Sequence, residues 1–158
     1  MARQSFFSFR YKNENWRASI VRNSWVTQDR KASGFFDSAD WEEVKKKSDS
    51  AIEKWIDSQL TGTSVTVVLI GSDTAGKKWI DYEITSSHKK GNGILGIHVH
   101  NVKDSNSKTS TKGKNPFSNW EFTRAGKTIT YPVYDWVNDN GYKNLGDWIE
   151  KAAKDAGK

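Results

Sequence analysis

The residues best suited to chemistry form one short pattern, WIDYE at 79–83. Trp79 and Glu83 are four positions apart, so in a helix they lie on one face, one turn apart. A carboxyl group beside an indole and a phenol can occupy a partly desolvated pocket, where its pKa shifts toward values useful in catalysis. The alternative is an ordinary surface acid paired with a neighbouring lysine. Spacing alone leaves both interpretations open.

A glycine-bearing segment just before this pattern matches most of a phosphate-binding loop. Residues 71–78 read GSDTAGKK, which fits G-x-x-x-x-G-K. The next position of that motif needs Ser or Thr to ligate Mg²⁺, and here it is Lys78. A nucleotide triphosphatase is therefore disfavoured, and the simpler interpretation is a turn whose lysines are solvated.

Two histidines, His98 and His100, lie close together in an apolar segment. On a strand they would share a face and could ligate one metal ion. Two ligands do not complete a metal site, and the chain has only one other histidine, His88, and no cysteine. We therefore expect structural histidines and no bound metal.

Missing residues exclude several other kinds of active site. The absence of cysteine excludes disulfides, zinc ribbons and thiol catalysis. No G-x-G-x-x-G follows a predicted strand and no G-x-S-x-G is present, which excludes a Rossmann dinucleotide turn and a serine-hydrolase elbow. A phosphate-accepting receiver domain needs acids after its first strand, where this chain has Phe9 and Arg10.

Five apolar segments predict the strands that would position these residues. VTVVLI at 65–70 is β-branched and apolar on both faces, which is typical of a central parallel strand. Pro132 places the last segment at or near a sheet edge, because proline cannot donate to a central ladder. The predicted strands cover residues 5–9, 34–36, 65–70, 93–102 and 128–134.

Four helices are predicted around these strands. The first has Trp16, Ile20 and Trp25 at roughly helical spacing. The second starts with a capping box, Asp40 with Glu43, ahead of an apolar face. The last has the clearest amphipathic pattern of the chain. The predicted helices cover residues 15–26, 40–61, 75–89 and 145–156.

The alternation of strands and helices predicts an open, mostly parallel α/β sheet with helices on both faces. In such folds, ligands bind beyond the carboxyl ends of the strands, at the topological switch point. The loops of interest therefore follow the first, third and fourth strands, at residues 8–11, 71–74 and 98–101.

The composition is consistent with one domain over residues 1–158. Only 35% of the residues are hydrophobic, but eight Trp, seven Phe and five Tyr compensate, because large rings bury more area. The longest apolar run is too short to span a bilayer, and the N-terminus lacks a signal-peptide pattern. We therefore expect a soluble, cytoplasmic protein with no membrane contact.

The formal net charge of +6 is compatible with an anionic ligand. Only residues 103–114 are locally one-sided, with four Lys and one Asp. No aromatic residue is interleaved there for base stacking, so a nucleic acid is not expected as a partner. Residues 103–119 are predicted to form a flexible polar loop.

Four segments together resemble a known family. They read FFSFRY at 6–11, GFFDS at 34–38, VTVVLIGSDTAGKKWIDYEI at 65–84 and GILGIHVHN at 93–101. On these segments the chain resembles the TIR-like family once catalogued as a domain of unknown function, whose members include TIR proteins of the bacterial Thoeris antiphage system. The resemblance is close from Phe6 to about Asn101 and looser beyond. It implies a five-stranded, flavodoxin-like fold.

The resemblance also implies a substrate site. Glu83 occupies the position of the glutamate that NAD-cleaving TIR domains require, and it is therefore the catalytic candidate. NAD⁺ is then the substrate, and no cofactor is expected. The candidate substrate-binding residues around the same pocket are Ser8, Phe9, Arg10, Ser72, Asp73 and Trp79.

The expected function follows from that resemblance. It is an enzyme that cleaves the nicotinamide–ribose bond of NAD⁺ and makes a cyclic ADP-ribose-type signal in antiphage defence. A downstream effector would sense this nucleotide signal, and the protein would self-associate conditionally. The main alternative is a non-catalytic TIR-like module that mediates only protein association, and a phosphate-loop nucleotide binder is less favoured.

Overall fold

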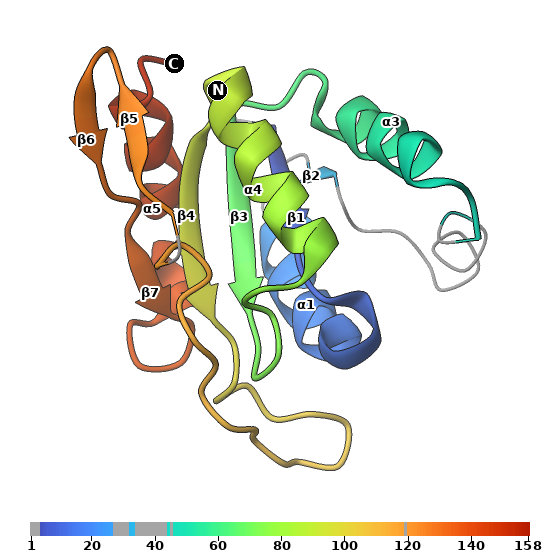
Figure 1. The fold of residues 1–158 in the computed structure, drawn as a ribbon. Coiled ribbons are helices and arrows are strands. Elements are labelled where there is room, and N and C mark those ends of the chain that lie inside the picture. The colour runs from blue at the N-terminus through green and yellow to red at the C-terminus, as the bar shows by residue number, and fades with distance from the viewer. Residues whose placement is uncertain (1–3, 27–31, 34–43, 45, 119) are drawn as a thin grey trace.

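Five parallel strands lie side by side at the centre of the computed structural model, in the order β2-β1-β3-β4-β7 (Figure 1). This is the strand order of flavodoxin-like folds, the fold that the family resemblance implied. The strands are β1 (Ser5–Ser8), β2 (Ala32–Ser33), β3 (Val65–Ile70), β4 (Gly93–His98) and β7 (Val133–Asp135). The structure describes residues 4–26, 32–33, 44, 46–118 and 120–158.

The central strand β3 carries the predicted apolar run and is buried along its whole length. Its register pairs Ser5 with Val65 on the β1 side and Gly93 with Val65 on the β4 side. Side chains that are apolar on both faces suit a strand covered by helices on both sides. The residues predicted to form the second strand, 34–36, lie outside the described residues; β2 is at 32–33.

The predicted strand 128–134 is wrong as a single element. Its first half forms β6 (Lys127–Ile129), which pairs with β5 (Phe122–Arg124) in a separate antiparallel hairpin. Its second half forms β7, the last strand of the sheet. Pro132 stands between them and lacks a donor, but its carbonyl accepts a hydrogen bond from the Gly96 amide at 2.9 Å. The edge position predicted from Pro132 is confirmed.

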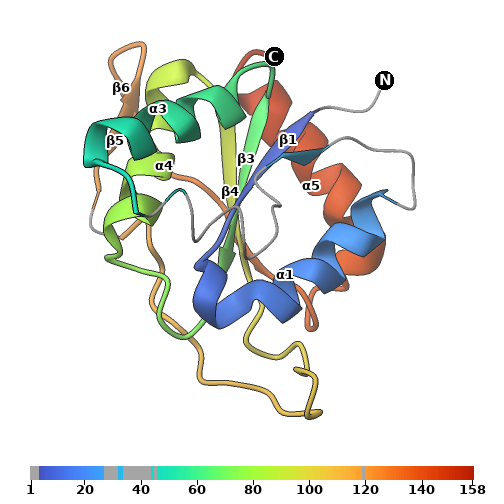
Figure 2. The same ribbon diagram turned by 90° about the vertical axis from the view of Figure 1, so that its right-hand side faces the viewer.

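Helices cover both faces of the sheet (Figure 2). The helices α3 (Asp49–Leu60) and α4 (Lys78–Lys90) lie on one face, and α1 (Tyr11–Val26) and α5 (Gly141–Asp155) lie on the other. Each face has its own apolar packing against the strands. No helix in the described part of the chain is long and apolar enough to cross a membrane.

The first predicted helix is present as α1, but the large apolar residues whose spacing indicated it are not its buried ones where this can be checked. Trp16 is 51% exposed and Ile20 is 38% exposed, whereas Ala18 and Val21 are fully buried. Small side chains let α1 approach the sheet closely, and the large ones extend outward. The neighbouring Arg17 is also buried, and its Nε donates to the Val102 carbonyl at 2.7 Å.

The second predicted helix, 40–61, is wrong as one continuous element: residues 46–48 are not helical, and α3 begins after them. Ser48 is its N-cap, and its Oγ accepts a hydrogen bond from the Ala51 amide at 3.3 Å. Ile52 and Ile56 are buried as the apolar pattern predicted. The proposed capping box of Asp40 and Glu43 lies outside the described residues.

The C-terminal helix matches its sequence pattern closely. It begins at Gly141, four residues earlier than predicted, and its buried residues include Leu145 and Ile149. The helix packs directly on β4, because a Cβ at Gly93 would lie 2.2 Å from the Ala152 carbonyl oxygen. Glycine at position 93 therefore permits the close contact between helix and sheet.

Residues 103–118 contain no helix or strand, and the first part of this segment runs beyond the carboxyl ends of β3 and β4 (Figure 1). The Asp104 carboxylate accepts the amides of Asn106 and Lys108 at 2.8 and 3.0 Å, which lowers the pKa of this carboxyl group. A guanidinium nitrogen of Arg17 donates to the Lys108 carbonyl at 3.1 Å. These contacts hold the start of the loop against α1.

Candidate functional site

The carboxyl ends of β1 and β3 meet at the topological switch point of the sheet. The chain leaves β1 toward β2 on one side and later returns to β3 on the other. Such a point leaves room for a ligand outside the strand ends. Ser8 ends β1, the loop from Gly71 follows β3, and α4 brings Glu83 to the same region.

The Glu83 carboxyl group is the most perturbed group of this site. The residue as a whole keeps some exposure, but its Oε2 atom is buried and has no hydrogen-bond partner among the described residues. Burial disfavours the charged form and raises the pKa of Glu83 to about 8. The Ser8 hydroxyl acts in the opposite direction and lowers this pKa.

Ser8 is fully buried, and its Oγ lies close enough to the Glu83 carboxyl group to affect its pKa, but it forms no hydrogen bond of ordinary geometry with any described residue. Two buried polar groups that lack protein partners are costly unless another molecule satisfies them. Ser8 and Glu83 therefore mark a position where a ligand hydroxyl group or cation would be stabilised.

A relay of hydrogen bonds fixes the backbone of Glu83 relative to the sheet. The Asn92 amide donates to the Thr66 hydroxyl at 3.3 Å, and the Thr66 and Ser87 hydroxyls are 2.7 Å apart. Ser87 in turn donates to the Glu83 carbonyl at 2.6 Å. The sequence analysis missed this relay, although a run of Ser and Thr on a helix facing a strand threonine is a readable signal.

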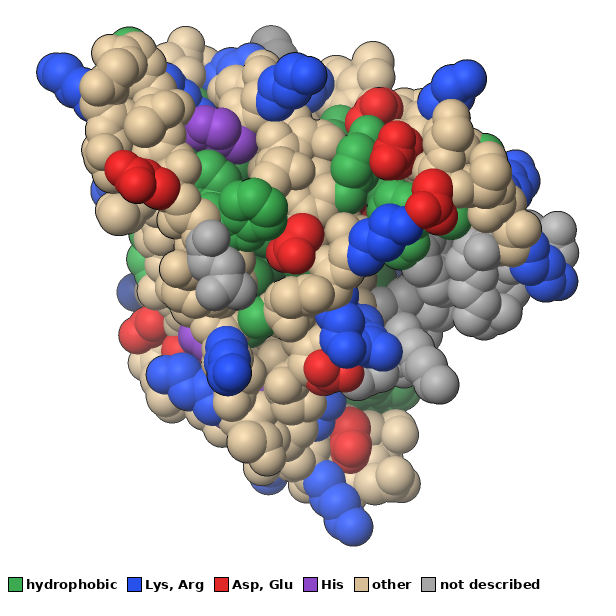
Figure 3. Space-filling model, in the orientation of Figure 1, with side chains coloured by type: hydrophobic (Ala, Val, Ile, Leu, Met, Phe, Trp, Pro, Cys, Tyr) green, Lys and Arg blue, Asp and Glu red, His purple; other side chains and the backbone are tan. Residues whose placement is uncertain are grey.

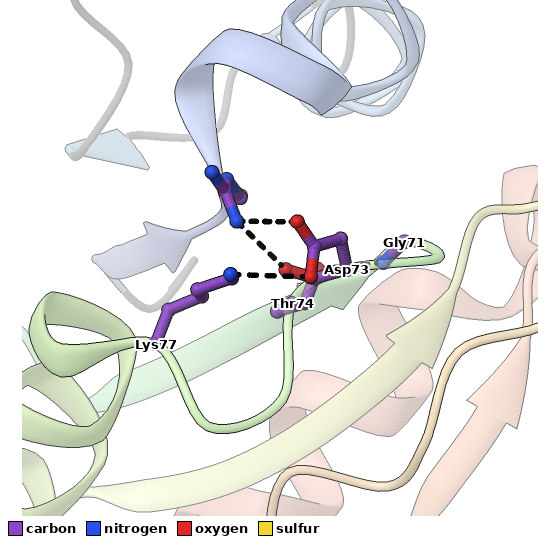
Figure 4. A network of polar contacts seen from close by, with 5 residues as sticks. Gly71, Asp73, Thr74 and Lys77 are labelled. Carbon is purple, nitrogen blue, oxygen red and sulfur yellow. Dashed lines mark hydrogen bonds and ion pairs between the residues drawn. The ribbon is translucent and has the colours of Figure 1, made fainter.

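Arg10, Asp73 and Lys77 form a charge network in front of the strand ends (Figure 4). The Arg10 guanidinium contacts one Asp73 carboxylate oxygen at 2.5 Å, and the Lys77 ammonium contacts the other at 3.2 Å. The three side chains come from the end of β1, the loop after β3 and the start of α4. The structure thus brings together Arg10 and Asp73, two of the candidate substrate-binding residues, and adds Lys77 to them.

The loop resembling a phosphate-binding loop is held by its own side chains. The Thr74 hydroxyl accepts a hydrogen bond from the Gly71 amide at 2.8 Å. Lys77 pairs within the loop, and Lys78 pairs with Asp49 at the start of α3. Asp73 and Lys77 are four positions apart, so this ion pair could have been read from the sequence, but the Lys78–Asp49 pair could not.

The remaining predicted substrate-binding residues are placed differently from one another. Trp79 is half-buried, packs against the apolar cluster that contains Phe6 and Ile52, and contacts the Tyr82 ring edge-on. Phe9 packs into the core on the other face of the sheet, with α1 and α5. Ser72 is exposed in the loop after β3.

His98 and His100 are both buried, and their rings meet edge to face with centroids 5.6 Å apart. No group of three or more His, Cys, Asp or Glu side chains within the described residues is arranged to hold a metal ion. Burial is the largest of the effects that lower the pKa of His98, so its imidazole is neutral near pH 7.

Charged side chains on the face covered by α4 are mixed in sign. Figure 3 shows Lys and Arg interspersed with Asp and Glu over this face. A groove for nucleic acid needs clustered cations. This face carries no such cluster among the described residues.

Comparison with known proteins identifies the family. Residues 6–104 match the family model of the Thoeris protein ThsB, TIR-like domain. The chain is also 36% identical over 191 residues to a protein of Bacillus cereus (strain MSX-D12) named "Putative cyclic ADP-D-ribose synthase ThsB1", and the match covers 94% of this chain and all of the relative. Together with the strand order and the glutamate at the switch point, these matches show that the chain belongs to the TIR-like domain family of the Thoeris protein ThsB.

Proposed function

We infer that this protein cleaves the nicotinamide–ribose bond of NAD⁺ and forms a cyclic ADP-ribose-type signal in antiphage defence. The observation that carries the inference is the buried, unpartnered carboxyl oxygen of Glu83 beside the Ser8 hydroxyl, at the switch point of the sheet. The relative named as a putative cyclic ADP-D-ribose synthase supports the same reaction class.

One carboxylate is enough for this chemistry. Glycoside hydrolysis usually needs a second carboxyl group to protonate the leaving oxygen. In NAD⁺ the bond from ribose C1′ to the pyridinium nitrogen breaks with both electrons going to nitrogen, so neutral nicotinamide departs without a general acid. Ionised Glu83 then stabilises the oxocarbenium-like ribose.

The raised pKa of Glu83 fits a role that begins when substrate binds. In the free protein the carboxyl group is mostly protonated at pH 7, because burial raises its pKa to about 8. A cationic nicotinamide riboside placed beside it favours the ionised form. Substrate binding therefore charges the group that the transition state needs.

The cations near the strand ends have a matching role toward the diphosphate of NAD⁺. Arg10 and Lys77 lie close enough to contact the same Asp73 carboxylate, so they can also converge on one phosphate group. Trp79, at the edge of the apolar cluster around α3, offers a ring for a planar base. Ser72 and Asp73 lie on the loop that borders the site.

The fate of the ribosyl cation decides the product. Attack by water gives ADP-ribose, and attack by a nitrogen of the trapped adenine gives a cyclic product; each attack releases one proton. We favour cyclisation on the name of the relative. A downstream effector would sense this signal, and conditional self-association would control its production.

The decisive experiment compares Glu83→Gln with Asp81→Asn on the same helix. Glu83→Gln keeps size and hydrogen-bonding reach but removes the charge, so NAD⁺ cleavage should fall by on the order of 10²-fold or more. Asp81→Asn should keep most of the activity. Nicotinamide release is followed by chromatography and cyclic product by mass spectrometry, at high protein concentration and with lysate from infected cells.

Two results would contradict the proposal. Full turnover in Glu83→Gln would remove this residue from the mechanism. No nicotinamide release from the unaltered protein under any of these conditions would favour the non-catalytic association module.

A further inference from the structure

A cavity of about 430 Å³ lies at the carboxyl ends of β4 and β7, which are separated from β1 by β3 in the sheet. It lies between the strand ends and the segment at 112–115 of the long loop. The side chains that matter for its chemistry are His98, Lys112, Asn115, Asp135 and Asp139.

His98 is a buried group of this cavity that lacks a partner. His98 is only 7% exposed, and its Nδ1 has no hydrogen-bond partner among the described residues. Its backbone is fixed, because the Trp136 amide donates to the His98 carbonyl at 3.0 Å. A rigid, buried and unsatisfied ring nitrogen indicates a missing hydrogen-bond partner.

One wall of the cavity carries two carboxylates, each with an oxygen to spare. One oxygen of Asp135 accepts the amides of Val137 and Asn138 at 3.0 and 2.9 Å. One oxygen of Asp139 accepts the Asp135 amide at 2.8 Å. Within the described chain, the second oxygen of each carboxylate accepts no hydrogen bond. Backbone amides thus fix both groups while leaving acceptors for a ligand.

The other wall offers donors. Lys112 is exposed and forms no ion pair with any described residue. The Asn115 side-chain oxygen accepts the Phe117 amide at 2.8 Å, which fixes this side chain and leaves its NH₂ group without a partner in the described residues. A cation and an amide donor thus line the same cavity as two carboxylates.

We propose that this cavity binds a phosphorylated ribose, as found in a nucleoside monophosphate or a sugar phosphate. The phosphate pairs with Lys112 and Asn115, the ribose hydroxyls donate to Asp135 and Asp139, and His98 forms a hydrogen bond at the floor. The volume lies in the range of small-molecule sites in proteins.

The cavity is separate from the Glu83 site, but the segment that lines it contacts the loop after β3, which borders that site. A Cβ at Gly113 would lie only 2.0 Å from the Gly71 carbonyl oxygen, so the segment that lines the cavity touches the loop after β3. None of the residues that would bind the phosphorylated ribose belongs to the Arg10–Asp73–Lys77 network. Binding here therefore does not depend on NAD⁺ cleavage.

The test uses AMP, ribose 5-phosphate, adenosine and inorganic phosphate as separate probes. Isothermal titration measures their affinities, and NMR follows the His98 ring and the Asn115 side-chain amide. AMP and ribose 5-phosphate should both bind and shift these signals. Adenosine and inorganic phosphate should each bind at least tenfold more weakly, because each lacks one half of the recognised group.

Variants locate the binding. Lys112→Ala should weaken AMP binding at least tenfold, whereas Lys114→Ala, on the same loop but outside the cavity, should leave it unchanged. Glu83→Gln should also leave it unchanged. Asp139→Asn keeps an oxygen for the Asp135 amide and should weaken binding severalfold without lowering thermal stability.

Three outcomes would overturn the proposal: no shift of His98 with millimolar AMP, equal binding of inorganic phosphate and AMP, or loss of AMP binding in Arg10→Ala but not in Lys112→Ala. The last outcome would place the nucleotide at the Glu83 site.

Discussion

The carboxyl edge of the sheet has two sites, one at the ends of β1 and β3 and one at the ends of β4 and β7, and their charged side chains are paired differently. At the β1–β3 end, Arg10 and Lys77 both pair with Asp73. At the β4–β7 end, Lys112 pairs with no described acid, and Asp139 keeps an oxygen that accepts nothing within the described residues. The first end must therefore exchange internal ion pairs for ligand contacts, whereas the second can accept a ligand as it stands.

The buried titratable groups of the two sites, Glu83 and His98, also differ in whether a ligand must change their charge. Glu83 is desolvated and its pKa is raised to about 8, so it becomes charged only when something at the site favours the charge. Burial lowers the pKa of His98, so its ring remains neutral and is ready to form a hydrogen bond. A site that changes on binding suits catalysis, and a site already in place suits recognition.

The largest effect expected in the unaltered protein is on the pH dependence of NAD⁺ cleavage. The pH profile of kcat/KM reports the pKa values of the free enzyme. With ionised Glu83 required and a pKa of about 8, kcat/KM should rise on the order of 50-fold from pH 6 to pH 8. Initial rates of nicotinamide release at low NAD⁺ measure it, with Asp81→Asn as the control. A flat profile over this range would contradict a catalytic carboxylate with a raised pKa.

The same pKa predicts how stability depends on pH. The folded protein holds the Glu83 proton more tightly than the unfolded chain, so the contribution of Glu83 to stability is most favourable at low pH and becomes less favourable as pH rises from about 4.5 to about 8. This loss should be on the order of 4 kcal/mol between pH 5 and pH 8.5.

Urea unfolding at pH 5 and pH 8.5 checks this prediction. Glu83→Gln should lack most of this pH-dependent loss, because the substituted side chain does not titrate. An identical pH dependence in both proteins would show that Glu83 is not desolvated in solution.

Local patterns in the sequence predicted the strand and the helix that position Glu83. The apolar run at 65–70 became the central strand, and the spacing of Trp79 and Glu83 placed both residues on α4, whose glutamate reaches the switch point. These features depend on side-chain periodicity, which the sequence displays directly.

Contacts across the fold could not be predicted in the same way. The Arg10–Asp73 pair joins residues 63 positions apart, and neither residue type indicates its partner. The exposed Trp16 shows the limit of periodicity, because helical spacing does not say whether large or small residues face the sheet. The pKa of Glu83 likewise depends on burial that only the packed structure reveals.

A smaller effect, that of Gly113→Ala, tests whether the site at the β1–β3 end and the cavity at the β4–β7 end are coupled. Gly113→Ala would put a methyl group 2.0 Å from the Gly71 carbonyl oxygen, so the loop at 112–115 or the loop after β3 must move. We expect AMP affinity and the kcat/KM for NAD⁺ each to fall about tenfold, since overpacking forces backbone shifts. Titration and initial rates measure the two effects, and Lys114→Ala is the control. An effect on AMP affinity alone would show that the two loops respond independently.

The smallest effect concerns Asp73, which holds the two cations that NAD⁺ would need. Asp73→Asn removes the charge that competes with a diphosphate for Arg10 and Lys77 but keeps a side chain of the same shape. The ion pairs are partly exposed, and exposed pairs contribute little, so the KM for NAD⁺ should fall only about threefold. Asp155→Asn, which removes a comparable exposed ion pair with Lys151 on α5, should leave KM unchanged. A rise in KM for Asp73→Asn would instead mean that Asp73 contacts the substrate, and that the cations at this end do not have to be released before NAD⁺ binds.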